Sequence, residues 1–469
     1  MHDDQEYETI NFSYILEQRR KGCGDSLFLT WDSQCWSYSE AQDCIGQAAA
    51  MIRAAGIRKQ VVAVWVKEAA AQLFLFLAVQ KSGNIPILIH EYLHGNELEE
   101  FLSGHAVSIL ISDNREVFPA GGPVVSCGND SFFMICRQIK PALSVPRGAC
   151  MAVMTSGSTS VPKLFFRTAQ SWAGFFPMQD KVFSITSKSC IFLQGSFGFT
   201  GNLNMALDVL CAGGEVTGTS SLRPSRWEQM IKEKEASHIY LIPSKLRLLA
   251  RYFSSEMHFV TMILSGSQCM SGALVCSLYR IFPCSEVILY YGSTEMNYVS
   301  WIRGRDILLR PHAVGRIFPG IRAVVRGGGI FVKSPYTVCP ADRFWTSGDA
   351  GHFDEDEFLI FEGRKQDIYN IKGNQVYKEK VLEALQEMPC CEEAEIMPFQ
   401  SSNGEIRLEA FLTPKTLPKR DIMHFLENRL HPWEMPVRFF FLRELPRTST
   451  GKIDYAMLRH IQEGVSFSV

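Results

Sequence analysis

The chain has 469 residues, a formal net charge of −2 at pH 7, 46% hydrophobic residues and 20% charged residues. This length is typical of roughly two to four domains, and the composition is that of an ordinary globular protein. A net charge so close to zero gives no electrostatic reason to expect a nucleic acid as partner.

The first residues and the apolar runs argue against targeting and membrane segments. Met1–Glu6 is acidic and lacks the apolar stretch of a signal peptide. The longest apolar run, Ala69–Val79, contains Gln72 and is too short to span a bilayer, so it predicts a buried helix and no transmembrane segment. We therefore expect a cytoplasmic protein.

The 14 cysteines include no CxxC pair, and Cys390 and Cys391 are adjacent, which is not the spacing of a zinc site. Without a secretion signal, reduced thiols are the expected state. Because a free cysteine behaves as a small hydrophobic residue, we expect most of these side chains in the core.

Strand-like apolar runs alternate with helix-like stretches from about Phe12 to Phe361. The runs in this part of the chain are Val61–Val66, Ile85–Ile89, Val107–Ile111, Ile239–Ile242, Thr261–Leu264, Ile321–Val325 and Ile330–Lys333. Such alternation predicts an α/β fold with layered sheets and covering helices.

One histidine pair has the spacing of a zinc protease. His90-Glu91-Tyr92-Leu93-His94 matches HExxH, which binds zinc only when both histidines share one face of a helix. Here the segment directly follows the predicted strand Ile85–Ile89, and Gly95 comes next. That context favours a strand end and a loop over a zinc helix.

A segment rich in hydroxyl groups, Thr155–Lys163, follows the apolar run Met151–Met154. Backbone N–H groups, several hydroxyls and one cation are what a polyphosphate needs, although a surface turn has a similar composition. The segment is not a Walker loop, because Pro162 stands where that loop requires glycine. The candidate phosphate-binding residues are Thr155, Ser156, Gly157, Ser158, Thr159 and Lys163.

Four further segments follow in a fixed order. They are Tyr291-Gly292-Ser293-Thr294-Glu295, Thr346-Ser347-Gly348-Asp349, Gly363-Arg364-Lys365-Gln366-Asp367 and Pro446-Arg447-Thr448-Ser449-Thr450-Gly451-Lys452-Ile453. Together with the hydroxyl-rich segment, they resemble the adenylate-forming superfamily of acyl-CoA synthetases, peptide-synthetase adenylation domains and luciferases. Each segment alone is a weak signal, and five in order are specific.

The resemblance implies two parts. Residues 1–366 would form a large adenylation domain of layered sheets and helices, and residues 367–469 a small mobile α+β lid hinged near Asp367. Within the second part, the predicted helices are Lys378–Leu385 and Lys419–Leu430, and the predicted strands are Glu405–Leu412 and Arg438–Leu442.

The resemblance also implies how MgATP is held. The hydroxyl-rich segment would grip the β- and γ-phosphates, and Thr294 and Glu295 would contact phosphate and magnesium, for which a carboxylate is the right hard ligand. Asp349 would accept hydrogen bonds from both ribose hydroxyls, with Arg364 beside it. The residues near the adenine would be Tyr291, Gly292, Ser265, Gly266 and Ser267.

Lys452 matches the catalytic lysine of the superfamily. A carboxylate must attack the α-phosphate of ATP, and an ammonium that bridges the two anions offsets their repulsion in the transition state. The chain departs from the usual pattern at Ser160, Ala169 and Asn370. These departures keep open a non-catalytic relative that binds a nucleotide or an acyl ligand.

The acid substrate is suggested by the segment Phe197-Gly198-Phe199-Thr200. Thr200 stands where relatives that activate amino acids carry an aspartate for the α-ammonium, so an amino acid is disfavoured. Phe197, Gly198 and Thr200 are the candidate pocket residues, in an apolar neighbourhood that suits a fatty or aryl acid equally.

The resulting hypothesis is an ATP-dependent ligase that joins a carboxylic acid to a thiol. It would need ATP, Mg²⁺ and coenzyme A. A stand-alone adenylation enzyme that loads the phosphopantetheine of a carrier protein is the first alternative, because both thiols end in the same arm. Nothing in the sequence argues for a luciferase-like oxygenase.

Overall fold

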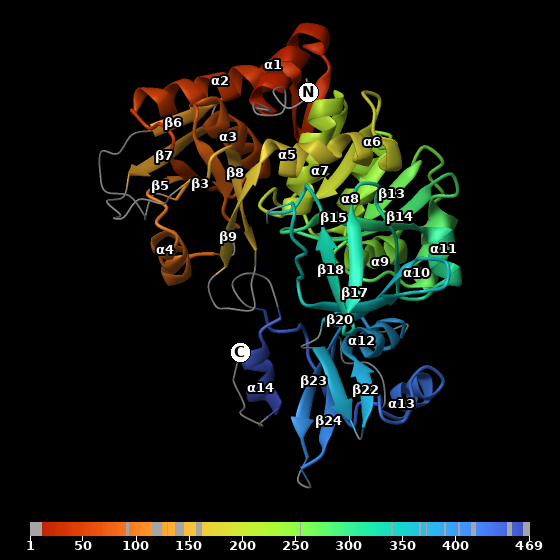
Figure 1. The fold of residues 1–469 in the computed structure, drawn as a ribbon. Helices are drawn as coiled ribbons and strands as arrows, with labels where there is room; N and C mark the ends of the chain where they lie inside the picture. Colours follow the sequence, from red (N-terminus) through yellow and green to blue (C-terminus); the bar gives the residue numbers. More distant parts are fainter. Residues whose placement is uncertain are drawn as a thin grey trace. The chain divides into compact units, whose positions relative to one another are not determined.

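The structure is a computed structural model. It describes residues 12–90, 93–114, 124–128, 130–136, 145–155, 162–253, 255–338, 341–364, 367–371, 373–388, 391–401, 404–413, 419–447 and 453–462. The chain forms two compact units. The first comprises Met1–Leu309, Ile317–Arg322 and Lys333–Trp345, and the second comprises Arg310–Arg316, Ala323–Val332 and Thr346–Val469 (Figure 1).

The large sheet of the first unit contains eight described strands, in the order β15-β14-β13-β12-β10-β11-β1-β2. From β14 to β1 neighbouring strands are parallel. At the two ends of this run, β15 pairs antiparallel with β14, and β2 pairs antiparallel with β1. Their bounds are β1 Leu27–Trp31, β2 Gln34–Ser37, β10 Cys190–Gln194, β11 Glu215–Thr219, β12 His238–Tyr240, β13 Met262–Ser265, β14 Glu286–Ser293 and β15 Asn297–Arg303. Two of the predicted strands are β12 and β13, and the α/β class is confirmed.

A second sheet of the first unit has the order β4-β3-β5-β7-β6. It contains three predicted strands, as β3 (Val61–Trp65), β4 (Ile85–Leu88) and β5 (Ile109–Ser112), and continues with β6 (Val124–Cys127) and β7 (Asp130–Cys136). Parallel β3, β4 and β5 are almost entirely buried, as expected for strands covered on both faces.

A separate antiparallel hairpin joins β8 (Ala149–Thr155) to β9 (Lys163–Thr168).

Helices surround the sheets of the first unit. They are α1 Phe12–Cys23, α2 Tyr38–Ala54, α3 Ala69–Lys81, α4 Gly95–Gly104, α5 Ala169–Trp172, α6 Phe176–Phe183, α7 Thr200–Ala212, α8 Pro224–Glu233, α9 Pro243–Tyr252, α10 Gly272–Ile281 and α11 Gly304–Leu309, with a 3₁₀ turn at Ala173–Phe175. The predicted buried helix is α3, in which every residue before Lys81 is buried. A helix that is apolar on all sides belongs in a core.

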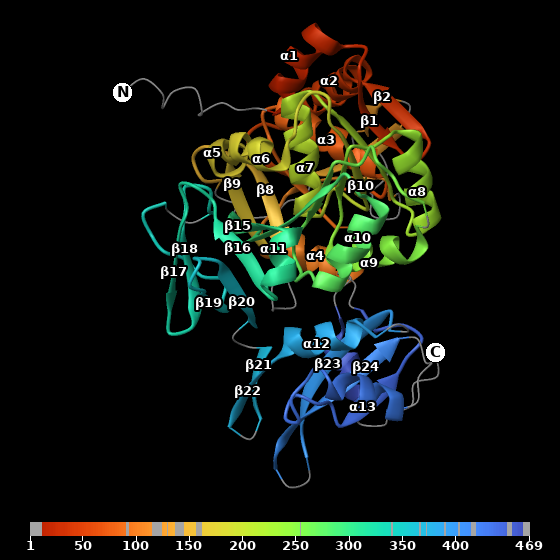
Figure 2. The same cartoon turned by 90° about the vertical axis from the view of Figure 1, so that its right-hand side faces the viewer.

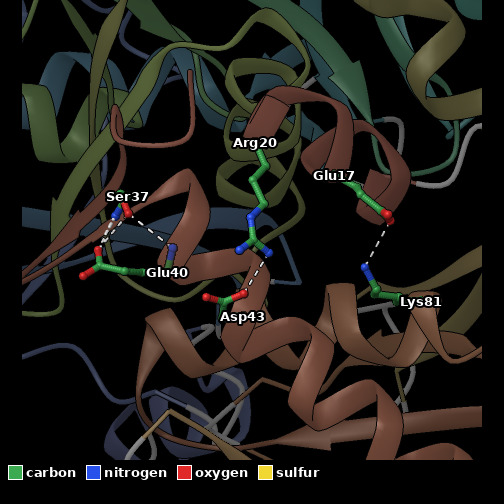
Figure 3. A network of polar contacts seen from close by, with 6 residues as sticks. All are labelled: Glu17, Arg20, Ser37, Glu40, Asp43 and Lys81. Carbon is green, nitrogen blue, oxygen red and sulfur yellow. Dashed lines mark hydrogen bonds and ion pairs between the residues drawn. The ribbon is translucent and has the colours of Figure 1, made fainter. Parts of the chain in front are cut away.

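Local polar contacts fix the start of α2 and join α1 to both α2 and α3 (Figure 3). Ser37 caps α2, and the Glu40 carboxylate accepts a hydrogen bond from the Ser37 backbone N–H at 2.8 Å. This capping box satisfies N–H groups that have no partner within the helix. The ion pairs Arg20–Asp43 (2.8 Å) and Lys81–Glu17 (3.3 Å) link the three helices at the surface, where each contributes little.

The second unit contains a five-stranded arrangement in the order β17-β18-β19-β20-β16. These strands are β16 Ala313–Ile317, β17 Arg322–Arg326, β18 Gly329–Lys333, β19 Asp349–Phe353 and β20 Leu359–Arg364. Residues Gly327 and Gly328, both at positive φ, form the turn between β17 and β18, as predicted.

The C-terminal part of the second unit is a small α+β body (Figure 2). Its elements are β21 Ile368–Ile371, β22 Asn374–Tyr377, α12 Lys378–Gln386, β23 Glu393–Gln400, β24 Ile406–Thr413, α13 Lys419–Glu427, β25 Arg438–Phe441 and α14 Tyr455–Gln462. Successive side chains of a strand point to opposite faces. Ile396 therefore packs with α12 and α13, whereas Met397 packs with Leu458 of α14.

The predicted domains, residues 1–366 and 367–469 with a hinge at Asp367, stay predictions. Asp367 is described and directly precedes β21. The second unit is continuous from Thr346 onward, but it also includes earlier residues. Strand β16, which lies before Thr346, pairs with β20, and β20 pairs with β19, so these strands belong together.

Three sequence expectations can be compared with the structure. Of the twelve cysteines that the structure describes, only Cys127 and Cys391 are buried, so the expectation that most cysteines lie in the core was wrong. No helix in the described part of the chain combines the length and the apolar character needed to cross a membrane. His90 and His94 lie outside helices, with α4 beginning at Gly95, and Glu91 and Tyr92 lie outside the described residues.

Candidate functional site

Several predicted site segments leave the first unit's large sheet at one edge. Strands β10, β12, β13 and β14 are parallel neighbours, so their carboxyl ends meet there. Phe197–Thr200 follows β10, Ser265–Ser267 ends β13 and continues beyond it, and Tyr291–Glu295 ends β14. The carboxyl edge of a parallel sheet is the usual place for a ligand in such folds.

The turn from Tyr291 to Glu295 joins β14 to β15. The pairing shifts register between Tyr291 and Gly292. A Cβ atom added to Gly292 would lie 2.1 Å from the carbonyl oxygen of Asn297, so only glycine fits there. Thr294 and Glu295 are partly exposed at the tip of this turn, where their side chains can meet a ligand.

A buried arginine forms hydrogen bonds with the backbone of the same turn. Arg167 on β9 is fully buried, and one guanidinium nitrogen donates to the carbonyl oxygens of Thr294 (3.2 Å) and Glu295 (3.4 Å). The other terminal nitrogen donates to Tyr336 O (2.8 Å) and to Ser171 O. Burial lowers the pKa of Arg167 to about 10, which leaves it charged at neutral pH.

The segment Ser265-Gly266-Ser267 is shaped by close packing. The Ser265 hydroxyl is buried and donates to Leu241 O at 2.7 Å. A Cβ atom on Gly266 would lie 2.4 Å from the Tyr290 ring, so glycine lets this strand end approach β14. Ser267 has a φ of 69°, a left-handed conformation that turns the chain away from the sheet.

The predicted pocket segment is fixed by α3. Gln72 accepts hydrogen bonds at its Oε1 from Ser196 Oγ (2.8 Å) and Phe197 N (2.9 Å), while its own amide donates to Val66 O (2.8 Å). Phe197 is fully buried against the Trp31 ring, so its side chain belongs to the core. Gly198 lies against the backbone of His90, where a Cβ would be 3.5 Å from His90 Cα.

Thr200, the first residue of α7, is brought to the Tyr291–Glu295 turn. Its hydroxyl lies 3.3 Å from the hydroxyl of Thr294. Residues separated by more than ninety positions in the chain thus meet at the carboxyl edge of the sheet. Thr200 and Thr294 together define one corner of the candidate site.

The hydroxyl-rich segment is described only at its ends. Thr155 and Lys163 face each other as the last pair of the β8–β9 hairpin. Ser156, Gly157, Ser158, Thr159 and the departure at Ser160 lie outside the described residues. On the Lys163 side, Pro162 O lies 2.8 Å from Nε2 of His105, which follows α4.

In the second unit, Asp349 and Arg364 lie opposite each other on β19 and β20. Arg364 Nε is 3.8 Å from Asp349 Oδ1, and the Ser347 hydroxyl donates to Asp349 Oδ2. Asp349 is buried, and Gly348 before it has a φ of 86°. Two residues predicted to contact the ribose are therefore neighbours.

Lys452 lies outside the described residues, but both sides of its loop are determined. Arg447 and Ile453 form an antiparallel bridge, and Asp454 N donates to Pro446 O at 2.8 Å. Just beyond, Tyr455 accepts a hydrogen bond from Lys378 Nζ at 2.6 Å. Lys378 also pairs with the Glu395 carboxylate at 2.7 Å. Thus the chain enters and leaves the loop at one fixed point.

Sequence reasoning missed Arg167 and Gln72. Each contacts a backbone group more than a hundred residues away, as the Arg167–Thr294 and Gln72–Phe197 hydrogen bonds illustrate. Neither stands within a segment that resembles a known motif. The only signal available for Arg167 was a charged residue directly after the apolar run Leu164-Phe165-Phe166.

Comparison with known proteins agrees with this architecture. Residues 16–329 match the family model described as "AMP-binding enzyme". An uncharacterized acyl-CoA ligase of Bacillus subtilis, YhfT, is 24% identical over 459 residues, covering 93% of this chain and 95% of that protein. Surfactin synthase subunit 3 of the same species is 22% identical over 97% of this chain, which spans 39% of that longer protein.

Among solved structures, o-succinylbenzoate CoA synthetase (MenE) of Bacillus subtilis, in complex with an acyl-adenylate intermediate, superimposes with a TM-score of 0.80. The superposition covers 95% of this chain and 97% of that chain, at 18% identity. The resemblance inferred from the five sequence segments is thereby confirmed at the level of fold and family.

Proposed function

Because the chain belongs to the AMP-binding enzyme family, we propose that it is an ATP-dependent ligase of a carboxylic acid and a thiol. In the first step, a carboxylate oxygen attacks the α-phosphorus of ATP, the bond to the β-phosphate breaks, and acyl-adenylate and pyrophosphate form. In the second step, a thiol sulfur attacks the acyl carbon. AMP leaves with the electron pair of the broken C–O bond, and the thiol proton is released.

The observation that carries this proposal is the corner formed by Thr200, Thr294 and Glu295. A hydroxyl from α7 lies 3.3 Å from a hydroxyl of the turn, and Arg167 holds the carbonyl groups of that turn. The partly exposed Glu295 carboxylate suits Mg²⁺, a hard cation that binds oxygen ligands. When bound, Mg²⁺ neutralises phosphate charge, and Glu295 would orient it.

The other site residues keep the roles that the motifs suggest. We propose that Thr155, Lys163 and the hydroxyls between them hold the β- and γ-phosphates, and that Tyr291 and Ser265–Ser267 lie beside the adenine. The Asp349 carboxylate, already oriented by Arg364 and Ser347, would accept hydrogen bonds from the ribose hydroxyls. Lys452 would stabilise the charge of the pentavalent transition state.

The proposed substrate is a fatty or aryl acid. Thr200 offers no carboxylate to an α-ammonium, and an unpaired cation in such a site is costly. Coenzyme A is the proposed acceptor, and the printed names of YhfT and MenE, an acyl-CoA ligase and a CoA synthetase, support it. The peptide-synthetase relative keeps a carrier-protein phosphopantetheine as the alternative.

The test is ATP–pyrophosphate exchange across a panel of fatty, aryl and amino acids with MgATP. We expect exchange that depends on a fatty or aryl acid, and acid-dependent loss of free thiol when coenzyme A is added. Glu295→Gln should lower the exchange rate by roughly 10- to 100-fold, because a charged partner is lost.

The exposed Glu355, which lies in the turn between β19 and β20 and outside the motif segments, gives the matched control Glu355→Gln. This variant should exchange at the normal rate. If no acid of the panel supports exchange, the result would point to the non-catalytic relative instead. Strong turnover of an amino acid would point to the carrier-loading enzyme.

A further inference from the structure

A lysine that no sequence motif identifies lies beside the candidate pocket segment. Lys245 is in the first turn of α9, directly after β12. Its ammonium donates to Gln194 O at 3.3 Å and lies 5.9 Å from the centre of the Phe199 ring. Gln194 ends β10 and Phe199 caps α7, so these contacts place the cation at the carboxyl edge of the sheet.

The charge of Lys245 has no counter-ion among the described residues. Its contacts there are one carbonyl oxygen and one aromatic face. An ammonium has three donors, so at least two remain for another acceptor. Burial lowers the pKa of Lys245 to about 8, which reflects a cation in surroundings that do not neutralise it.

The groups around this cation are neutral. The His90 ring lies 4.1 Å from the Phe199 ring, and burial together with the charge of Lys245 lowers the pKa of His90 to about 4. His90 is therefore uncharged at neutral pH. A Cβ atom on Gly195 would lie 3.6 Å from the ammonium, so glycine leaves room beside the charge.

Ligands can reach this cation. Lys245 is only partly buried, and the Phe199 side chain is 44% exposed. The next residue after Phe199 is Thr200, whose hydroxyl lies 3.3 Å from Thr294. An acid bound along Phe199 would thus have one end near Thr200 and could present another part to Lys245.

We propose that Lys245 binds a second anionic group on the acid that is activated, so that the preferred substrates are dicarboxylic acids. The carboxylate at the far end would accept the free donors of the ammonium, and the hydrocarbon portion would pack on the Phe199 ring. An ion pair in a partly desolvated site discriminates strongly against an apolar end. This inference rests on the proposed ligase function and narrows its substrate class.

The experiment compares matched acids that differ only at the far end, pentanoate against glutarate and heptanoate against pimelate. For the unaltered protein, kcat/KM in ATP–pyrophosphate exchange should favour the dicarboxylate by about tenfold or more. Lys245→Met should reverse or abolish that preference, mainly through KM. Lys245→Arg should keep the preference, and Lys181→Met, at an exposed position on α6, should leave it unchanged.

A second measurement separates this inference from the ligase proposal. Calorimetric binding of glutarate and pentanoate to the unaltered protein and to Lys245→Met needs no turnover. Selective glutarate binding that Lys245→Met removes supports the dicarboxylate site even if exchange fails with every acid. The inference is overturned if the unaltered protein prefers the monoacid in both measurements. It is also overturned if Lys245→Met weakens the binding of both acids of a pair equally. That result would mean that the lysine binds the reacting carboxylate, which both acids share.

Discussion

Arg167 stabilises the candidate site without belonging to any recognisable motif. Its guanidinium satisfies carbonyl groups from three separate segments, at Ser171, at Thr294–Glu295 and at Tyr336. The Trp172 ring lies 5.3 Å from the guanidinium carbon and covers it. A single buried cation therefore fixes where the tip of the Tyr291–Glu295 turn can stand.

We predict that Arg167→Met lowers both stability and adenylation. Removing the donor leaves buried carbonyl groups without a partner, which should cost about 3 kcal/mol or more. Thermal unfolding and pyrophosphate exchange would measure the two effects, with the exposed Arg58→Met as control. An unchanged melting temperature would contradict the structural role. A normal exchange rate in a destabilised variant would contradict the link to the site.

The contrast between Glu295 and Arg167 explains which site residues a sequence can identify. Tyr291-Gly292-Ser293-Thr294-Glu295 is a continuous segment whose glycine is demanded by a 2.1 Å approach, so the local sequence carries the signal. Arg167 and Lys245 act through contacts with residues far along the chain or on other elements. Such contacts depend on the tertiary fold, and no local pattern predicts them.

A second residue with unusual chemistry is Asp208 on α7. It is fully buried, and burial raises its pKa well above the usual range, with the charge of Asp180 on α6 adding to the effect. Tyr298 and Cys211 are the other titratable groups that feel its charge. Because its pKa is higher in the folded than in the unfolded chain, Asp208 costs the fold least at low pH, and this cost grows as pH rises towards the pKa of the folded state.

We predict that Asp208→Asn raises the melting temperature, and that the gain grows as pH rises from about 5 to about 8. Asparagine keeps the shape of the side chain, but its amide does not ionise as pH rises. Thermal unfolding at several pH values would test this, with Asp43→Asn on the exposed face of α2 as control. A gain that is constant with pH would mean that Asp208 is not protonated in the folded protein.

At the scale of elements, apolar runs predicted the buried parts of the fold well. The predicted helix Ala69–Val79 is α3 (Ala69–Lys81), and the predicted strand Glu405–Leu412 is β24 (Ile406–Thr413). The hairpins β8–β9 and β21–β22 were not predicted as pairs. A short run shows that a strand is favoured, but its partner depends on which edges the rest of the fold leaves open.

Three elements of the C-terminal part are joined by one cluster around a buried ion pair. Lys378 begins α12, Glu395 lies on β23 and Tyr455 begins α14. The Lys378 and Glu395 side chains are 7% and 8% exposed and 2.7 Å apart, and the Tyr455 hydroxyl lies 3.2 Å from the other carboxylate oxygen. The cluster fixes α14 directly after the loop that contains Lys452.

We predict that Lys378→Met destabilises this part by roughly 3–5 kcal/mol, because it leaves the Glu395 carboxylate buried and unpaired. Combining it with Glu395→Gln should recover much of the loss. Hydrogen exchange across β23 and β24 would report it. Arg429→Met breaks a partly exposed pair with Glu387 and should cost only about 0–1 kcal/mol. Equal losses of stability in Lys378→Met and Arg429→Met would show that the buried ion pair contributes no more than an exposed one.

At the scale of the whole molecule, the resemblance predicts a division at position 367, which stays a prediction. The two compact units of the structure depend on strand pairing that the sequence does not reveal. Ala313 pairs with Ile360, and Gly329 pairs with Ala350. Strands from before position 346 therefore join the second compact unit. The hinge at Asp367 stays a prediction, and it is testable through the two half-reactions.

The proposed chemistry needs Lys452 in the first half-reaction only. The ammonium stabilises the charge that develops when the acid attacks ATP, and it has no role when a neutral thiol attacks the finished acyl-adenylate. Lys452→Ala should therefore lower acyl-adenylate formation by roughly 100-fold or more, and leave thioester formation from supplied acyl-adenylate nearly unchanged. Single-turnover assays of each half-reaction would measure both rates.

Asp367→Pro should have the opposite effect. Proline fixes φ, so a hinge at this position would lose the freedom to rotate between the two half-reactions. We expect acyl-adenylate formation to continue and thioester formation to slow, provided that the variant keeps the melting temperature of the unaltered protein. Equal damage to both half-reactions by both variants would contradict a lid that alternates between two orientations. Intact adenylation in Lys452→Ala would remove the catalytic role of the lysine itself, whatever the behaviour of the hinge.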